Sequence, residues 1–344
     1  MKHEISVKTE GGEGRENYII REYERKLKTY FGAAYCLAVS SGTAALIAAM
    51  KVLEIKSPEE VITSPAAPLC TAYPILASGA TLVFSDIRHD NFSLDPAGLA
   101  EKVTERTKAI VDVPMWGYPT PAEEIQEWAG ERGIPLVFDL AHCTGTMRNG
   151  KSLSAYCDIA CYSTQKNKIF STGEGGFLLT DQEGYYEQAL LYTRMGNLNG
   201  HDFGLNYKLS HLQAEAGISG IDKVECNLSL RRNNSRKITE GISHPNIALL
   251  PVLPGSLPSY QRLVFYTKDG RKGLAQYMED KGIPSDIGKY AIKPLYGYPI
   301  LEEYIAFCPN TERVLSSMTT VAVHIGYTEE ELAYIIDTIN SFPG

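Results

Sequence analysis

Two lysines in one polar segment have the type and spacing needed for covalent chemistry. Lys166 and Lys168 stand between an apolar run at 159–162 and another at 177–180, and a glycine-rich turn at 173–176 follows them. Reactive groups at strand ends are typical of α/β enzymes. A partly desolvated lysine there has a lowered pKa, so its amine becomes nucleophilic toward aldehydes. The segment therefore indicates a Schiff base, although a loop lysine taken alone is more often a solvated surface charge.

Two further segments supply what a pyridoxal phosphate site needs. Residues 39–46 (Val-Ser-Ser-Gly-Thr-Ala-Ala-Leu) predict a small-residue turn that begins a helix, where exposed N–H groups and the positive dipole end suit a phosphate dianion. Residues 135–138 (Pro-Leu-Val-Phe) have a buried-strand pattern that ends in Asp139, an acid able to pair with the protonated ring nitrogen of the cofactor. Each segment is also compatible with an ordinary helix cap. Their order and spacing together favour the cofactor site.

With these residues in place, the chain resembles the pyridoxal phosphate-dependent sugar aminotransferases of the DegT/StrS type, a branch of the aspartate aminotransferase fold. The resemblance covers nearly the whole chain and implies an α/β fold, with a mostly parallel sheet flanked by helices and a smaller C-terminal α/β domain. We expect a large cofactor-binding domain with an N-terminal helix at 1–240 and a small domain at 241–344. The matching motifs are Ser-Ser-Gly-Thr-Ala-Ala-Leu (40–46), Asp-Leu-Ala-His (139–142), Ser-x4-Lys-x4-Gly-Glu-Gly-Gly (163–176) and Gly-Leu-Asn-Tyr-Lys (204–208).

The family pattern implies which residues hold the cofactor. Lys168 lies five residues before Gly173 and five after Ser163, as the Schiff-base lysine does in the family, whereas Lys166 fits neither count. We expect Lys168 to carry the proton during transamination and Asp139 to keep the ring nitrogen protonated. The remaining expected contacts are Gly42, Thr43 and Ser163 to the phosphate, His142 near the ring hydroxyl, and Asn206 to the phosphate of a neighbouring subunit. The resemblance thus implies a homodimer with shared active sites.

Two departures from the family pattern concern the substrate. Pro68 stands where most members have an aromatic residue that stacks on the cofactor ring, and Tyr73 comes five residues too late to replace it. The segment 113–117 (Val-Pro-Met-Trp-Gly) lacks the usual histidine. These differences argue against a nucleotide-sugar substrate in particular. We expect amino transfer from glutamate or glutamine to a keto-sugar, keto-cyclitol or related small intermediate. Elimination, racemisation or cyclisation on the same fold, or a non-catalytic binding protein, remain the alternatives.

Composition limits the class of protein. The 344 residues include 33 Lys and Arg against 41 Asp and Glu, and no basic run suggests a nucleic-acid groove. No apolar stretch approaches the roughly 20 residues that a membrane helix needs, and the start has no signal-peptide core, so we expect a cytoplasmic protein. The seven cysteines are scattered without the partners of a metal site, and we interpret them as structural thiols. Cys143 beside His142 is the one sequence-adjacent candidate for a catalytic thiol.

Apolar runs alternate with helix-like runs, as a doubly wound sheet requires. We expect helices at 17–31, 121–132 and 210–237, and a proline-rich boundary loop at 250–260. Beyond this loop, segments 260–266, 271–282 and 329–341 predict a small strand-and-helix domain. The strands expected in the large domain are 60–63, 81–84, 108–113, 135–138, 158–162 and 176–179.

Overall fold

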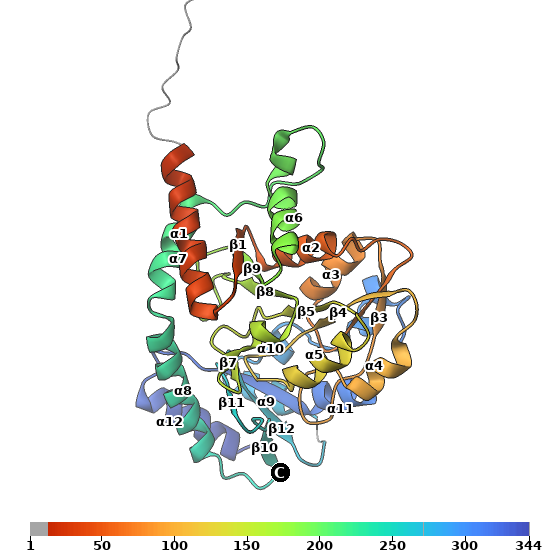
Figure 1. The fold of residues 1–344 in the computed structure, drawn as a ribbon. Helices are drawn as coiled ribbons and strands as arrows, with labels where there is room; N and C mark the ends of the chain where they lie inside the picture. The colour runs from red at the N-terminus through yellow and green to blue at the C-terminus, as the bar shows by residue number, and fades with distance from the viewer. Residues whose placement is uncertain (1–12, 271, 344) are drawn as a thin grey trace, which may run out of the picture.

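The computed structural model describes residues 13–270 and 272–343. A seven-stranded sheet, in the order β1-β9-β8-β5-β4-β2-β3, forms its centre (Figure 1). Neighbouring strands from β3 to β8 are parallel, and β9 is antiparallel to both of its neighbours. This confirms the prediction of a mostly parallel sheet. The strands are β1 (Tyr35–Val39), β2 (Glu60–Thr63), β3 (Thr81–Phe84), β4 (Thr107–Asp112), β5 (Leu136–Asp139), β8 (Ile159–Ser163) and β9 (Gly176–Thr180).

Both faces of this sheet are buried under helices, as expected for parallel strands. Successive side chains point to opposite faces, so Ala109 and Val111 of β4 belong to one apolar core and Ile110 belongs to the other. Helices α2, α3 and α6 contribute to the first core, and α1, α5 and α7 to the second. The helices are α1 (Glu13–Phe31), α2 (Gly42–Val52), α3 (Leu69–Ala77), α4 (Pro96–Lys102), α5 (Ala122–Gly130), α6 (Glu183–Thr193), α7 (His211–Ile221), α8 (Val224–Gly241), α9 (Leu274–Asp280), α10 (Asp286–Lys289), α11 (Pro309–Ser317) and α12 (Glu329–Asn340).

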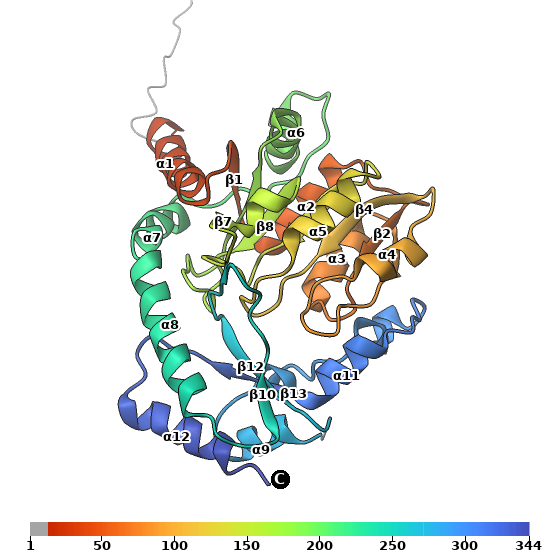
Figure 2. The same cartoon turned by 60° about the horizontal axis from the view of Figure 1, so that its bottom comes forward.

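A second, antiparallel sheet lies toward the C-terminal part of the chain, in the order β10-β12-β13 (Figure 2). Together with α8, α9 and α12 it encloses a third apolar core. Helix α8 ends at Gly241, beside the boundary predicted at 240/241, and the division into two domains stays a prediction. A small sheet of β11, β6 and β7 completes the fold. These strands are β6 (Met147–Arg148), β7 (Lys151–Ser152), β10 (Ile247–Leu249), β11 (Ser256–Leu257), β12 (Arg262–Thr267) and β13 (Met318–Ala322).

The expected strands lie within two residues of observed ones, but α1 begins four residues before the expected helix at 17–31, and β1, β10 and β13 were not expected. The short strand β1 was missed: only residues 32–34 separate it from α1, and its run Tyr-Cys-Leu-Ala-Val shows no alternation of polar and apolar residues. The expected helix at 210–237 is divided into α7 and α8 by a turn at Asp222 and Lys223, and α8 continues to Gly241. Within the described residues, no helix is long and apolar enough to cross a membrane.

The topology brings the predicted site residues to one edge of the large sheet. Strands β5 and β8 are parallel neighbours, with Asp139 opposite Cys161, so their carboxyl ends meet at the same edge. Asp139 ends β5 and Ser163 ends β8. Such an edge is where ligands bind in open α/β sheets.

Candidate active site

A cavity of about 450 Å³ opens at this edge, between the large sheet and the β12 region. Lys168 and His142 line it, together with Pro68 and Trp116. Arg262, Gln261 and side chains from the segment 286–298 form the opposite wall. The cavity therefore joins residues that are more than two hundred positions apart in the sequence.

Lys168 stands in a loop that its own backbone holds in shape. Thr164 N–H donates to the Gly175 carbonyl at 2.9 Å, and Lys166 N–H donates to the Gly173 carbonyl at 2.8 Å. Gly173 has a φ of 82°, which explains the glycine at this turn. The loop directs Lys168 to the cavity, whereas Lys166 is exposed, in agreement with the prediction that Lys166 is a solvated neighbour.

Burial lowers the pKa of the Lys168 amine, although the nearby Asp139 carboxylate acts in the opposite direction. Desolvation penalises the charged form of an amine, so more of the neutral nucleophile is present than on a surface lysine. This is the electrostatic environment that the sequence predicted for a lysine reacting with an aldehyde.

Asp139 is buried at the end of β5, and two donors fix its carboxylate. Thr71 Oγ1 donates to Oδ2 at 2.6 Å and Ala141 N–H donates to Oδ1 at 3.1 Å. Burial raises the pKa of Asp139, while these two hydrogen bonds and the Lys168 ammonium oppose the rise. The carboxylate is thus oriented and poised to pair with a cationic ring nitrogen. The sequence analysis did not identify Thr71, because it belongs to α3 whereas Asp139 ends β5.

His142 lies in the cavity wall as a neutral imidazole. Burial, and then the positive charges of Lys168 and Arg262, hold its pKa well below the usual value. Its Nδ1 accepts a hydrogen bond from the Trp116 backbone N–H at 3.3 Å, which places the ring proton on Nε2. His142 can therefore donate one hydrogen bond to a ligand.

Gly42, which precedes Thr43, lies against Ser163, and none of the three residues is among those that line this cavity. Helix α2 begins at Gly42, and Ser41 caps it by accepting from Ala44 N–H at 3.0 Å. A Cβ on Gly42 would lie 2.9 Å from Ser163 Cβ, so the helix start and the end of β8 are in close contact. The first N–H groups of a helix lack partners within the helix, and its dipole favours an anion. The residues present fit a phosphate group.

Asn206 lies apart from these residues. It is exposed on the segment between α6 and α7, pairs with Arg194 in an isolated bridge, and its side chain accepts from Lys208 N–H at 3.4 Å. The structure therefore does not bring Asn206 to the site of its own chain, which is compatible with the predicted role in a neighbouring subunit.

Pro68 lines the cavity at the start of α3, where the family pattern has its stacking aromatic. Tyr73 is 42 % exposed and lies away from the cavity lining. Trp116 does line the cavity, and its indole packs edge-on against Phe92 with ring centroids 4.8 Å apart. Trp116 therefore gives the cavity an aromatic wall. The sequence analysis considered its segment, 113–117, only because the family's usual histidine is missing there.

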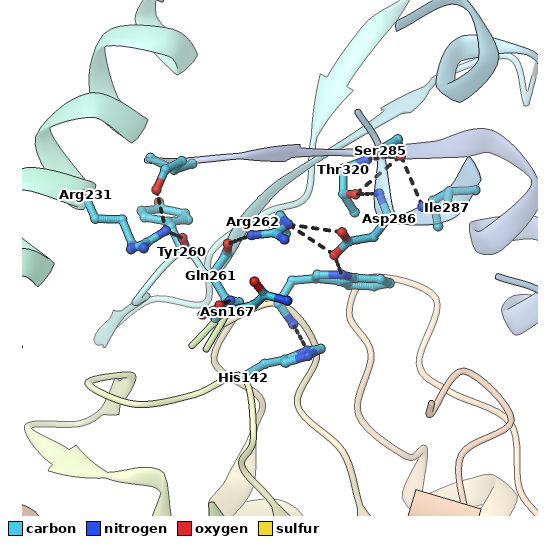
Figure 3. A network of polar contacts seen from close by, with 12 residues as sticks. His142, Asn167, Arg231, Tyr260, Gln261, Arg262, Ser285, Asp286, Ile287 and Thr320 are labelled. Carbon is cyan, nitrogen blue, oxygen red and sulfur yellow. Dashed lines mark hydrogen bonds and ion pairs between the residues drawn. The ribbon is translucent and has the colours of Figure 1, made fainter. Parts of the chain in front are cut away.

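The far wall contains functional candidates that the sequence analysis missed (Figure 3). Arg262 begins β12 and forms an ion pair with Asp286, which begins α10, at 3.2 Å. Trp116 Nε1 donates to the same carboxylate at 3.2 Å. Gln261 Nε2 donates at 2.7 Å to the carbonyl of Asn167, the residue before Lys168. The only feature of the sequence that could have indicated a functional role for Arg262 is its charge at the start of an otherwise apolar strand.

Cys143 is buried and its Sγ lies 3.1 Å from the Pro114 carbonyl. Burial raises its pKa to about 12, so a nucleophilic thiolate is disfavoured and the interpretation as a structural thiol holds. Among the described residues, no three His, Cys, Asp or Glu side chains are grouped so that they could hold a metal ion.

Comparison with known proteins identifies the class. Residues 7–340 match the model of the DegT/DnrJ/EryC1/StrS aminotransferase family, and the chain belongs to this family. It is similar to GDP-perosamine synthase of Escherichia coli O157:H7, at 26% identity over 95% of this chain and 90% of that protein. It is also similar to the putative pyridoxal phosphate-dependent aminotransferase EpsN of Bacillus subtilis, at 27% identity over 66% of this chain and 61% of that protein. The predicted class, a pyridoxal phosphate-dependent aminotransferase, is confirmed.

Solved structures share the fold. The putative sugar aminotransferase Spr1654 of Streptococcus pneumoniae, in its PLP form, has a TM-score of 0.87 at 22% identity and covers 94% of this chain and 90% of its own. The sugar aminotransferase CalS13 of Micromonospora echinospora has a TM-score of 0.86 at 23% identity, over 94% of this chain and 91% of its own. These matches confirm the predicted fold class.

Proposed function

We propose that this protein transfers an amino group from glutamate or glutamine to a keto group on a sugar, cyclitol or related small intermediate. The single observation that carries the proposal is the convergence of a half-buried Lys168, a buried Asp139 and the α2–β8 phosphate cradle at one sheet edge. Pyridoxal phosphate, when bound, supplies an electron sink for the carbanion formed at the donor's α-carbon.

The chain's own residues have separate roles in this proposal. Lys168 holds the cofactor covalently and, once released, moves the proton from the donor's α-carbon. Asp139, held by Thr71, keeps the ring nitrogen protonated. His142 donates from Nε2 toward the ring hydroxyl, since its Nδ1 is already an acceptor. Gly42 and Thr43 N–H groups and the Ser163 hydroxyl bind the phosphate.

We propose further that two copies of the chain share their sites through Asn206. The segment around Asn206 exposes large apolar side chains, including Leu198 at 78 %, Phe203 at 73 % and Leu212 at 76 %. Exposed apolar surface of this kind is typical of an interface. Light scattering should give a dimer, and Asn206→Ala should weaken cofactor affinity without changing the dimer. A monomer that retains the cofactor fully would contradict this arrangement.

The relatives' names support the proposed substrate class. GDP-perosamine synthase is named for a nucleotide-linked sugar. Another relative, of Micromonospora echinospora and 26% identical, is named as a putative L-glutamine:3-amino-2,3-dideoxy-scyllo-inosose aminotransferase. With Pro68 in the place of the usual aromatic, we favour an acceptor that is not nucleotide-linked.

The visible absorption spectrum before and after addition of L-glutamate or L-glutamine tests the proposal. We expect a lysine-linked cofactor band that shifts to the pyridoxamine form with one of these donors. A band that no amino donor changes would exclude transamination and favour elimination, racemisation or cyclisation. Absence of any band after addition of pyridoxal phosphate would contradict the proposal as a whole.

A further inference from the structure

An ion pair forms part of the cavity wall opposite Lys168. Arg262 Nε donates to both carboxylate oxygens of Asp286, at 3.3 and 3.2 Å, and Trp116 Nε1 donates to one of them at 3.2 Å (Figure 3). All three side chains line the cavity. Asp286 is also the one acidic side chain among the described residues that line it, whereas Lys168, Arg262 and Lys293 are basic.

One edge of the Arg262 guanidinium is still open. Nη1 donates to the Gln261 carbonyl at 2.9 Å, and within the described part of the chain Nη2 donates no hydrogen bond. The two side chains of the ion pair are 21% and 15% exposed. A guanidinium binds a carboxylate best through two parallel N–H groups, but Asp286 uses Nε alone. Arg262 therefore has room for a second carboxylate without leaving its position.

The proposed function, on which this inference rests, requires one cavity to accept two unlike molecules in turn. The amino donor carries an α-carboxylate, whereas the polyhydroxy ketone carries no charge near its reacting carbon. A half-buried guanidinium without a counterion would favour the first molecule and would be costly beside the second. The cavity therefore needs a negative charge that neutralises Arg262 after the amino donor has left.

We propose that Asp286 is an internal stand-in for the donor's carboxylate. It neutralises Arg262 while the uncharged acceptor is bound, and it shares Arg262 with the α-carboxylate while the donor is bound. Asp286 thus determines specificity: it lowers the affinity for amino acids and keeps the cavity compatible with a neutral polyol.

Asp286→Asn in the holoenzyme tests this role, because the amide keeps an oxygen for Trp116 and removes the charge. Isothermal titration with glutarate, an unreactive dicarboxylate, should show about tenfold tighter binding in this variant, and Arg262→Gln should bind it about tenfold more weakly than the parent. The neutral polyol myo-inositol should gain nothing in Asp286→Asn. Asp337→Asn, on the exposed face of α12, is the matched control and should leave both affinities unchanged.

Three results would overturn the inference. They are unchanged or weaker glutarate binding in Asp286→Asn, equal gains for glutarate and myo-inositol, and unchanged glutarate binding in Arg262→Gln. If Asp286→Asn fails to fold, Asp286→Glu and Arg262→Gln provide the test: the first should bind glutarate as the parent does and the second should not. Failure of the proposed function is distinct, because then neither L-glutamate nor L-glutamine converts the cofactor, whatever the glutarate affinities.

Discussion

Gly42→Ala directly perturbs the contact between the start of α2 and the end of β8. The added Cβ would lie 2.9 Å from Ser163 Cβ, and 3.4 Å from Ser163 Cα and the Tyr162 carbonyl oxygen. Carbon atoms in favourable contact are about 3.5–4.0 Å apart. The helix start and the strand end must therefore separate by a few tenths of an ångström.

Two magnitudes follow from this separation. Overpacking of a tight contact costs about 1–3 kcal/mol, and the helix preference of alanine over glycine returns up to about 1 kcal/mol. We expect the free energy of unfolding of the cofactor-free protein to fall by about 1–2 kcal/mol. Loss of one well-aligned hydrogen bond to the phosphate would weaken cofactor affinity by about 10- to 100-fold.

Urea unfolding of the cofactor-free protein and spectrophotometric titration with pyridoxal phosphate measure the two effects. Gly184→Ala, in α6, is the control, because no atom lies within 4 Å of its added Cβ. Ser163→Gly in the Gly42→Ala background removes the contacted carbon and should restore stability but not phosphate affinity. The reasoning is refuted if Gly42→Ala matches Gly184→Ala in both measurements.

Three further predictions concern buried groups. Burial raises the pKa of Glu24 to about 7 from 4.5, so the folded state retains the proton longer and stability falls as pH rises from about 4.5 to about 7. Glu24→Gln should remove this fall. Between pH 5 and pH 8 its free energy of unfolding in urea should rise by up to about 3 kcal/mol relative to that of the parent, and parallel pH profiles of the two proteins would contradict this. Thr71→Val should slow the half-reaction with L-glutamate about tenfold, because Asp139 loses its donor at 2.6 Å; an unchanged stopped-flow rate would show that this hydrogen bond is dispensable. The lowered pKa of Lys168 predicts that the rate of cofactor uptake levels off at a lower pH than for a solvated lysine, and a stopped-flow pH profile with an ordinary lysine inflection would disagree.

The cofactor side of the site could be predicted from the sequence because its residues belong to local motifs. Lys168 and Ser163 are fixed by counts within one segment, and Asp139 and His142 by another. Residues at a strand end and in the loop after it are close in the sequence and also close in the structure. Their spacing in the sequence therefore predicts their relative positions. The family comparison supports the class, while the individual roles remain predictions.

The substrate side could not be predicted in the same way. Arg262 and Asp286 meet because β12 pairs with β13 and α10 packs against β13, where Asp286 N–H donates to Thr320 Oγ1. Thr71 reaches Asp139 across 68 positions of sequence. No local pattern encodes such contacts, since each residue has an ordinary surface or strand context when considered alone.

Trapping the cofactor on the protein tests the central claim most directly. The holoenzyme is reduced with borohydride, digested, and mapped by mass spectrometry, with Lys168→Ala and Lys166→Ala treated in parallel. We predict that the reduced cofactor is attached to Lys168 in the parent and in Lys166→Ala, and is absent in Lys168→Ala. Attachment to Lys166, or to no lysine of this loop, would contradict the account.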